Sequence, residues 1–329
     1  MKISQSETEK EVEPRERINS IKTDLYDGTN EAHQPTNICN ENEATGDTDK
    51  VKDTDNASSA STVEVLDDKV LLMSQSSVIS REGLCPAVGL TLYEPQLSVS
   101  NNAAARSKSS RMPAQPIKLY YLPPSPPCRS VMLLAKVLGL ELDLELTNIL
   151  EGQHMTPEYL KMNPQHTIPT MDDNGFILWE SRAILSYLVN AYGRDDSLYP
   201  KNPRLRAVVD ARLNFDLGTL YLRYFNLYIP MLFRGEEYDE EQAAKFDEAL
   251  GWLNTMLDGK AFVAGDNMTI ADISIVVTLS NIHAFGYDYS AHENVVNWFD
   301  RMKKTLEPYD YEEIDETGAE ILASFLKKD

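Results

Sequence analysis

Residues 117–139 read IKLYYLPPSPPCRSVMLLAKVLG, and this stretch predicts a strand, a turn and a helix in that order. The first six residues, 117–122, are apolar, aromatic or long-chained, which is typical of a short strand. Pro126 and Pro127 lack backbone N–H groups and therefore fit the first turn of a helix. The apolar run that follows ends at Gly139, a residue that commonly closes helices. The stretch therefore predicts the opening strand and helix of an α/β domain.

The segments after Gly139 continue the alternation of strands and helices. Residues 140–149 alternate in polarity and predict a strand, and a short helix is expected around 156–160. Residues 167–172 and 175–180 predict two strands, because Asp-Asn-Gly between them is a hairpin turn signal. Residues 181–193 predict a helix that ends at a glycine. The order is β-α-β-α-β-β-α, and we assign it to a small α/β domain over residues 116–196.

From Pro203 to the end the sequence predicts only helices. Apolar residues spaced by three or four form one stripe on a long helix: Leu205, Val209, Leu213, Leu217, Leu220 and Tyr224. Further helices are expected near 239–258, 269–285, 292–305 and 316–327. Thr269-Ile-Ala-Asp272 is a variant of the capping box, and the almost wholly apolar run after it predicts a buried central helix. The expected fold is an α/β domain followed by an all-helical domain over residues 203–329.

The first 115 residues differ sharply in composition from the rest. They contain no Trp or Phe, and acidic side chains outnumber basic ones about two to one in residues 1–69. Such a segment buries too little apolar surface to offset its ordering entropy, so we expect a disordered acidic extension that ends in a linker. Two interpretations stay open for it: a regulatory tail, or an upstream extension of the reading frame.

Charge and cysteine content exclude several classes of function. The formal net charge is −21, which disfavours binding to nucleic acid or to anionic membrane surfaces. No apolar run is long enough for a transmembrane helix. The three cysteines, Cys39, Cys85 and Cys128, are odd in number and widely spaced, so neither a disulfide framework nor a metal site is expected. A cytoplasmic protein is the simplest interpretation.

The first candidate site is Ser125, at the junction between the first strand and the first helix. One interpretation is purely structural, since serine is a favoured N-cap residue. The other is functional: a helix N-terminus attracts anions, a thiol placed there ionises more easily, and the Ser125 hydroxyl would donate a hydrogen bond to the thiolate.

Two further motifs fit the ends of a peptide ligand. A proline inside the strand-like run around Ile168-Pro169 is explained by a cis peptide bond, which would leave the backbone of Ile168 free for a peptide-like ligand. Glu180 and Ser181 begin a helix, where they either cap it or hold the charged head of an amino acid. Together the three motifs indicate an extended thiol peptide with an amino-acid head.

Three motifs precede a helical second domain, in the order SPPCRS, NPQHTIPT and DNGFILWESRAI. In this order they resemble the delta class of insect glutathione transferases, with the epsilon class as the near alternative. The resemblance covers residues 117–329 and implies a thioredoxin-like first domain. It implies that Ser125 stabilises the glutathione thiolate and that Ile168, before cis-Pro169, pairs with the cysteinyl unit. The other glutathione contacts it implies are His154 and His166 at the glycine end, and Glu180, Ser181 and Arg182 at the γ-glutamyl end. For His154 a solvated loop histidine is the alternative.

Tyr221, Tyr224 and Tyr228 share one helix face, at spacings of three and four. Two interpretations stay open: an aromatic core, or, together with Leu122 and Phe233, the wall of an apolar substrate pocket.

The expected function is therefore a glutathione transferase that joins the thiolate to apolar electrophiles, with peroxidase or dehydrochlorinase side activity possible. Glutathione is the expected co-substrate, no metal is expected, and the resemblance implies a homodimer. Departures from the family pattern are Pro124 and Pro126, which stiffen the Ser125 loop, and Asn214 in the dimer-clasp region. The two prolines support the alternative of a non-enzymatic ligand carrier with the same fold. An adaptor in which the fold only dimerises the long tail is a third, disfavoured by the intact glutathione motifs.

Overall fold

The computed structural model describes residues 112–326, and the expectations for the acidic extension fall outside these residues. A four-stranded sheet and its helices come first, in the predicted order β-α-β-α-β-β-α. The elements are β1 (Ile117–Tyr121), α2 (Pro126–Leu138), β2 (Leu142–Leu146), α3 (Pro157–Met162), β3 (Thr170–Asp173), β4 (Phe176–Trp179) and α4 (Ser181–Tyr192). The thioredoxin-like fold is thus confirmed, although β2 is shorter than the strand predicted over 140–149.

The sheet has the strand order β2-β1-β3-β4. β1 is parallel to β2 and antiparallel to β3, and β3 is antiparallel to β4. The turn between β3 and β4 is formed by Asn174 and Gly175, which both have positive φ, and Asp172 Oδ1 accepts a 2.7 Å hydrogen bond from the Gly175 N–H. Positive φ at two successive turn residues is the conformation that the Asn-Gly pair adopts readily, so the hairpin signal was correct.

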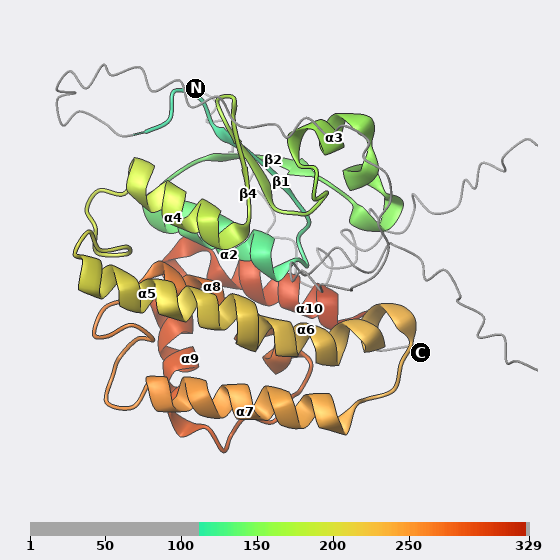
Figure 1. The fold of residues 1–329 in the computed structure, drawn as a ribbon, viewed down its shortest axis with the longest axis vertical. Coiled ribbons are helices and arrows are strands. Elements are labelled where there is room, and N and C mark those ends of the chain that lie inside the picture. Colours follow the sequence, from blue (N-terminus) through green and yellow to red (C-terminus); the bar gives the residue numbers. More distant parts are fainter. Residues whose placement is uncertain (1–111, 327–329) are drawn as a thin grey trace, which may run out of the picture.

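Helix α2 ends as the sequence predicts, at Gly139 with φ 70°. Its apolar side chains, such as Val131, Leu134 and Leu138, are buried in the main core. Figure 1 shows α2 and α4 between the sheet and the helical part of the chain, while α3 stands apart beside the sheet. The N-terminal turn of α2, which carries Ser125, therefore lies close to the helices that follow.

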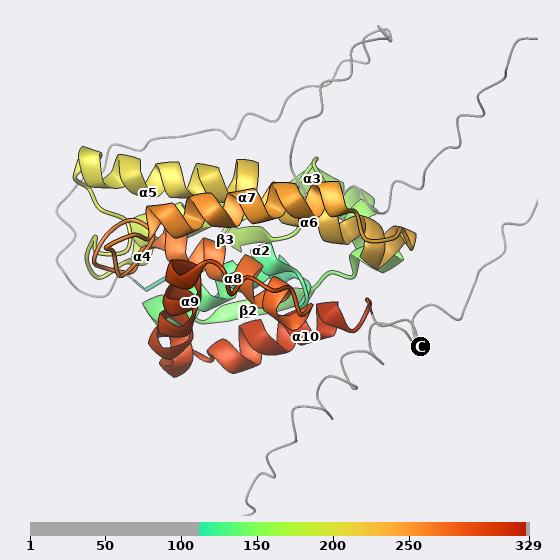
Figure 2. The same cartoon turned by 90° about the horizontal axis from the view of Figure 1, so that it is seen from below.

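The second half is entirely helical, as predicted. Its helices are α5 (Pro203–Phe215), α6 (Tyr221–Ile229), α7 (Glu240–Met256), α8 (Ile270–Ala284), α9 (Glu293–Leu306) and α10 (Thr317–Ala323). In Figure 2, α5, α6 and α7 lie on one side of α8, and α9 and α10 lie on the other.

The long helix expected after Pro203 is interrupted. A π-helical turn, η5 (Asp216–Leu220), separates α5 from α6, and a second, η6 (Pro230–Arg234), follows α6. The predicted apolar stripe holds for Val209, Leu213, Leu220 and Tyr224, which are buried, but it is wrong for Leu205, whose exposed fraction is 57%. Leu205 lies before the π turn, in the first turn of α5, where Pro203 and Arg204 are exposed as well.

Helix α8 is the core of the helical part and is buried from Ile270 to Ile282. The predicted capping box is present, with the Thr269 side chain and the Asp272 side chain each bonded to the other's backbone. Asp272 also accepts hydrogen bonds from Val263 N at 2.8 Å and Trp298 Nε1 at 3.0 Å. These bonds compensate for the burial of a carboxylate.

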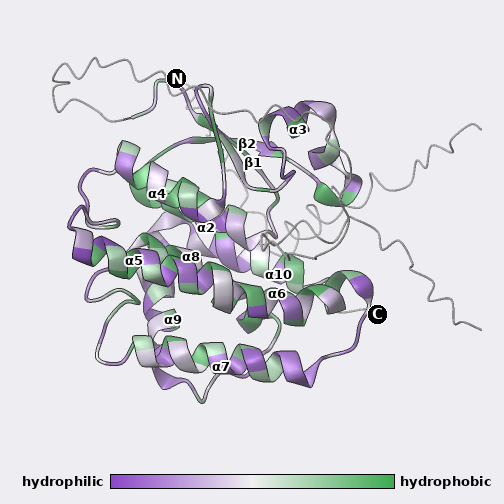
Figure 3. Ribbon diagram, in the orientation of Figure 1, coloured by the Kyte–Doolittle hydropathy of each residue, from purple (hydrophilic) through white to green (hydrophobic). Residues whose placement is uncertain are grey.

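The outer helices carry both polar and apolar residues. Along α5 and α7 the two kinds alternate around the helix, with polar side chains in purple and apolar ones in green (Figure 3). Such amphipathic helices pack on a core with one face and meet water with the other. Between Met112 and Leu326, none of the helices combines the length and the apolar character needed to cross a bilayer.

Candidate active site

The register of the sheet brings four loops to one end of it. Tyr121, the last residue of β1, pairs with Leu146, the last residue of β2. Thr170, the first residue of β3, pairs with Tyr120 on one side and with Trp179, the last residue of β4, on the other. The loops after β1, after β2, before β3 and after β4 therefore emerge together. These loops carry all the predicted glutathione contacts.

Ser125 occupies the N-cap position of α2, with φ −77° and ψ 114°, but its side chain makes no capping hydrogen bond. The interpretation of Ser125 as a capping hydroxyl is therefore wrong. Its hydroxyl is hydrogen-bonded to the thiol of Cys128 instead. The residue is nearly buried, with 2% of its surface exposed. Because Pro126 and Pro127 have no N–H groups, the hydroxyl is a polar group free to turn towards a ligand at this helix end.

Cys128 is not a competing nucleophile. Burial raises the pKa of its thiol to about 11, and the hydrogen bond from Ser125 opposes this rise only in part. The thiol is therefore protonated at neutral pH, and a protonated thiol is a poor nucleophile.

The loop before β3 contains the predicted cis Ile168-Pro169 bond. Tyr159 fixes this loop from behind, since its hydroxyl donates to Thr167 O at 2.7 Å and lies 3.0 Å from Thr170 Oγ1. Asn163 Nδ2 adds a 3.0 Å hydrogen bond to the same carbonyl. Neither backbone group of Ile168 is hydrogen-bonded within the described part of the chain. Backbone groups that are not engaged within the fold can pair with a peptide.

His154 and His166 lie next to each other in this region, with ring centroids 6.1 Å apart. His154 is 1% exposed, so the alternative of a solvated loop histidine is wrong. Among residues 112–326, neither of its ring nitrogens has a hydrogen-bond partner, and the same holds for Nδ1 of His166. Burial and the nearby His166 lower the pKa of His154, so its ring is neutral at pH 7 and still carries one N–H donor. Buried polar atoms without protein partners are costly, so these nitrogens are available to hydrogen-bond a ligand.

Glu180 stands at the N-cap of α4 with φ 72° and ψ 100°, and its side chain makes no capping hydrogen bond. Capping by Glu180, like capping by Ser125, is thus not what the side chain does. Positive φ in a residue with a Cβ is uncommon and clusters at functional sites. Burial raises the pKa of the Glu180 carboxyl, and Arg182 opposes the rise. Ser181 follows at the first helical position and is 4% exposed.

Arg182 is the second residue of α4 and connects this end of the helix to the helical part of the chain. Its guanidinium forms a 2.7 Å ion pair with Asp216, and its Nη1 donates to Ser181 Oγ at 3.2 Å. Asp216 is completely buried and also accepts a 2.6 Å hydrogen bond from Ser274. Arg182 therefore supports Ser181 from behind.

Asp216 and Ser274 were missed by the sequence analysis. The only signal for Asp216 was an acidic residue next to the apolar stripe of the long helix, and the π turn that turns it inward could not be anticipated. Nothing in the sequence around Ser274 distinguishes it from other small residues of the apolar helix α8.

The three tyrosines predicted on one helix face are buried. Tyr221, Tyr224 and Tyr228 are each at most 4% exposed, and their ring centroids follow one another at 5.6 Å. This supports the interpretation as an aromatic core. Phe233 packs against Phe325 with centroids 6.3 Å apart, and Leu122 lies in a separate small core with Cys128 and Ile168. Their contact with a substrate stays a prediction.

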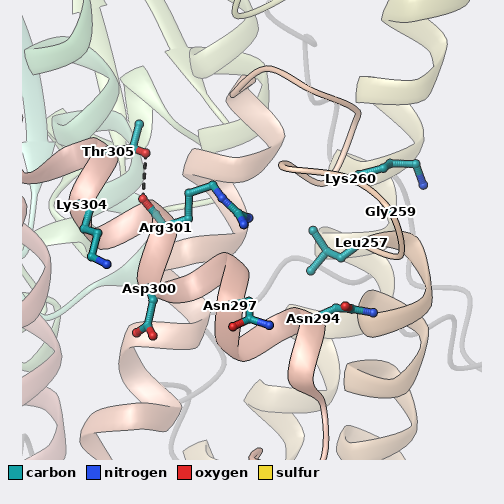
Figure 4. A pocket seen from close by; sticks show the side chains of 9 residues that line it. All are labelled: Leu257, Gly259, Lys260, Asn294, Asn297, Asp300, Arg301, Lys304 and Thr305. Carbon is teal, nitrogen blue, oxygen red and sulfur yellow. Dashed lines mark hydrogen bonds between the residues drawn. The ribbon is translucent and has the colours of Figure 1, made fainter.

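Two hollows lie away from these residues. One, of about 590 Å³, lies between α9 and the turn after α7, and its lining is mainly polar (Figure 4). Figure 4 shows Arg301 and Thr305 on α9, where the Thr305 hydroxyl donates to the Arg301 carbonyl. The other, of about 1440 Å³, lies beside β2 and is lined in part by Pro123 and Gly318. None of the predicted site residues lines either hollow.

Comparison with known proteins agrees with this arrangement. A family model described as the N-terminal domain of glutathione S-transferase matches residues 119–197, and one for the C-terminal domain matches residues 236–301. Glutathione S-transferase D7 of Anopheles gambiae is 52% identical over 209 residues, which are 64% of this chain and 96% of the relative.

Solved structures are similar as well. The glutathione transferase BmGSTD1 of Bombyx mori is 77% identical with a TM-score of 0.65, and the match covers 65% of this chain and 100% of that one. A glutathione transferase homologue of Drosophila mojavensis, solved with bound glutathione, is 33% identical with a TM-score of 0.60 and covers 64% and 96% of the two chains. The fold and the site thus define a two-domain protein with a thioredoxin-like domain and a helical domain. The chain belongs to the glutathione transferase family, in its insect delta class.

Proposed function

We infer that this transferase conjugates glutathione to apolar electrophiles and that Ser125 is the residue that activates the thiol. The observation that supports this role is the position of Ser125 at the mouth of α2 with a hydroxyl that does not cap the helix. On binding, the hydroxyl turns from the Cys128 thiol to the glutathione sulfur and donates a hydrogen bond to the thiolate. The thiolate then attacks the electrophilic carbon and displaces its leaving group.

The size of the effect is sufficient for catalysis at neutral pH. A hydrogen bond to a charged group contributes about 1.5–3 kcal/mol, and one pKa unit corresponds to about 1.4 kcal/mol. Ser125 alone would therefore lower the pKa of the bound thiol by about one to two units. The N-terminal dipole of α2 acts in the same direction.

The rest of the glutathione molecule would be held by the loops around Ser125. His154 and His166, with three ring nitrogens without partners, suit the carboxylate of the glycine end. The free backbone of Ile168, fixed by cis-Pro169, suits the cysteinyl unit. Glu180 and Ser181 suit the ammonium and carboxylate of the γ-glutamyl end, with Arg182 positioning Ser181 from behind.

The electrophile would bind next to the sulfur, between Leu122 and the helical domain. Tyr221, Tyr224 and Tyr228 form the aromatic floor of this region, and Phe233, which is only partly buried, is the member of the set best placed to meet a ligand. An apolar wall with few polar groups accepts varied hydrophobic substrates.

Peroxide reduction and dehydrochlorination use the same thiolate, and we propose them as side activities. We also propose that the protein is a cytoplasmic homodimer.

Turnover of a chloronitrobenzene with glutathione tests this function. We expect conjugation by the wild-type chain and a loss of kcat in Ser125→Ala, with partial retention in Ser125→Thr, which keeps a hydroxyl. Displacement of a bound dye by apolar compounds, with no conjugation at high enzyme concentration, would support the ligand carrier instead. Full activity in Ser125→Ala would contradict the role assigned to the hydroxyl.

A further inference from the structure

Arg129 is a completely buried arginine in the first turns of α2, four residues after Ser125. Its Nη1 lies 2.7 Å from Asp315 Oδ1, and both side chains are fully shielded from solvent. Its Nη2 donates to Asn281 Oδ1 and lies 3.5 Å from Val277 O, both on α8. A single side chain of the glutathione domain thus contacts two separate helical segments of the other domain.

Asp315 is itself held in place by its neighbours. It lies in the π-helical segment η8 (Glu312–Glu316), directly before α10. Ser280 donates a hydrogen bond to Asp315 Oδ2 and lies 2.8 Å from the Tyr311 hydroxyl, which also bonds to Asp315. Burial raises the pKa of the Asp315 carboxyl, while Arg129 and these hydroxyls oppose the rise. The guanidinium therefore has a counter-charge fixed by α8 and η8.

The same contact region includes the loop that carries Ser125. The Arg129 N–H donates a 3.1 Å hydrogen bond to Ser125 O, so the arginine and the serine are joined by the first backbone bond of α2. On α10, a Cβ added to Gly318 would lie 2.4 Å from Arg129 Cδ and 2.7 Å from Pro123 O. The glycine allows α10 to touch the backbone of the loop two residues before Ser125.

We propose that Arg129, clamped by Asp315 and packed against Gly318, is a positioning residue that fixes the Ser125 hydroxyl relative to the bound sulfur. The inference rests on the role proposed for Ser125. A buried ion pair is weak evidence for stability, because well-packed apolar residues often replace one without loss. The location of the Arg129–Asp315 pair indicates another role. It connects the N-terminal end of α2, where the sulfur would bind, to the helical domain, where the electrophile would bind. A displacement of this turn by about 1 Å is enough to impair catalysis strongly.

The consequence is a specific spectroscopic and kinetic signature. If the tether is loosened, the hydroxyl no longer meets the sulfur in good geometry, and the pKa of bound glutathione rises by about one unit, a tenfold change in the ionisation constant. The value of kcat/KM then falls about tenfold at neutral pH, in proportion to the lost thiolate. The loss shrinks at alkaline pH, where the thiol ionises without help. A merely structural defect would lower activity equally at every pH.

The test is an ultraviolet titration of the glutathione thiolate bound to the full chain, combined with the pH profile of kcat/KM. The variants are Asp315→Asn, Gly318→Ala and the apolar pair Arg129→Met/Asp315→Leu. Gly318→Ala keeps both charged residues but places a Cβ against the Arg129 side chain and Pro123 O, and the apolar pair removes both charges. The test therefore does not depend on Asp315→Asn folding. Trp298→Phe is the matched control, because it removes a buried hydrogen bond to Asp272, in the first turn of α8, that involves neither Arg129 nor Asp315.

We expect the three variants to raise the bound thiol pKa and Trp298→Phe to leave it unchanged. If they leave it unchanged while Ser125→Ala raises it, the positioning role is wrong and the role of Ser125 stands. If Ser125→Ala also leaves it unchanged, the proposed activation of the thiol fails and this inference fails with it.

Discussion

His154 and His166 face each other with ring centroids 6.1 Å apart, and three of their four ring nitrogens make no hydrogen bond. His154 lies in a short 3₁₀ helix, η4 (Gln153–Met155), after β2, and His166 lies in the loop before β3. The parallel pairing of β1 with β2 and the antiparallel pairing of β1 with β3 bring these loops together. Together the two rings place hydrogen-bonding nitrogens without protein partners, among residues 112–326, at one point of the structure.

Replacement of His154 should weaken glutathione binding with little effect on the chemical step. In His154→Ala the glycine carboxylate loses one charge-assisted hydrogen bond, which contributes about 1.5–3 kcal/mol, so KM for glutathione should rise by about tenfold or more. The measurement is KM for glutathione at a saturating electrophile concentration. His283→Ala, at an exposed position on α8, is the control. An unchanged KM in His154→Ala would place the glycine end elsewhere.

The buried His154 should also make stability depend on pH. Its folded pKa lies below the ordinary value of 6.5, so the unfolded chain binds more protons in the window below 6.5. The free energy of unfolding should therefore be highest above that value and fall as the pH drops through the window. His154→Gln removes the titrating group and should flatten this part of the profile, as measured by urea unfolding across pH. Parallel profiles for the two proteins would show that His154 titrates normally.

The Arg182–Asp216 pair should be important for both stability and binding. Asp216→Asn leaves a largely buried guanidinium without its counter-charge, and breaking a buried pair in this way costs about 3–5 kcal/mol. Ser181 would lose its support, so KM for glutathione should rise as well. Glu248→Gln is the matched control, because it breaks the exposed pair with Arg223, which contributes about 1 kcal/mol or less. Similar urea midpoints for the two variants would argue against the importance of the buried pair.

The capping box of α8 should contribute to stability alone. Asp272→Ala removes a fully buried carboxylate that accepts hydrogen bonds from Thr269, Val263 and Trp298, and we expect a loss of about 3 kcal/mol or more. Since none of these groups approaches the proposed glutathione site, KM for glutathione in the folded fraction should not change. Thermal unfolding and steady-state kinetics on one preparation separate the two effects, and a selective rise in KM would link the box to the site.

Local signals in the sequence were sufficient for most of the fold. The proline pair that begins α2, Gly139 after it and the Asn174-Gly175 turn each restrict the backbone strongly, so the first helix and the hairpin followed from them. The cis bond before Pro169 followed in the same way. Long-range contacts could not be predicted from local signals. Arg182 and Asp216 are separated by 34 positions in the sequence, and Arg129 and Asn281 by 152 positions.

The packing of individual side chains was the least predictable feature. The sequence could not show that His154 is buried, because its neighbours in Glu-Gly-Gln-His are polar. It could not show that Leu205 is exposed, because the apolar period begins at this residue, although the first turn of α5 lies at the surface. The sequence predicted that Ser125 lies at the N-terminus of α2. It could not show that the Ser125 hydroxyl bonds to the Cys128 thiol instead of capping the helix, because that contact is made only in the folded chain.

The most direct test of the account is the pKa of glutathione bound to the wild-type chain and to Ser125→Ala, read from the ultraviolet absorbance of the thiolate during a pH titration. If Ser125 activates the thiol, the wild-type complex is largely ionised at pH 7 and the pKa of the bound thiol rises by about one to two units in Ser125→Ala. A bound sulfur that is still protonated at neutral pH in the wild type, or that titrates identically in the two proteins, would contradict it.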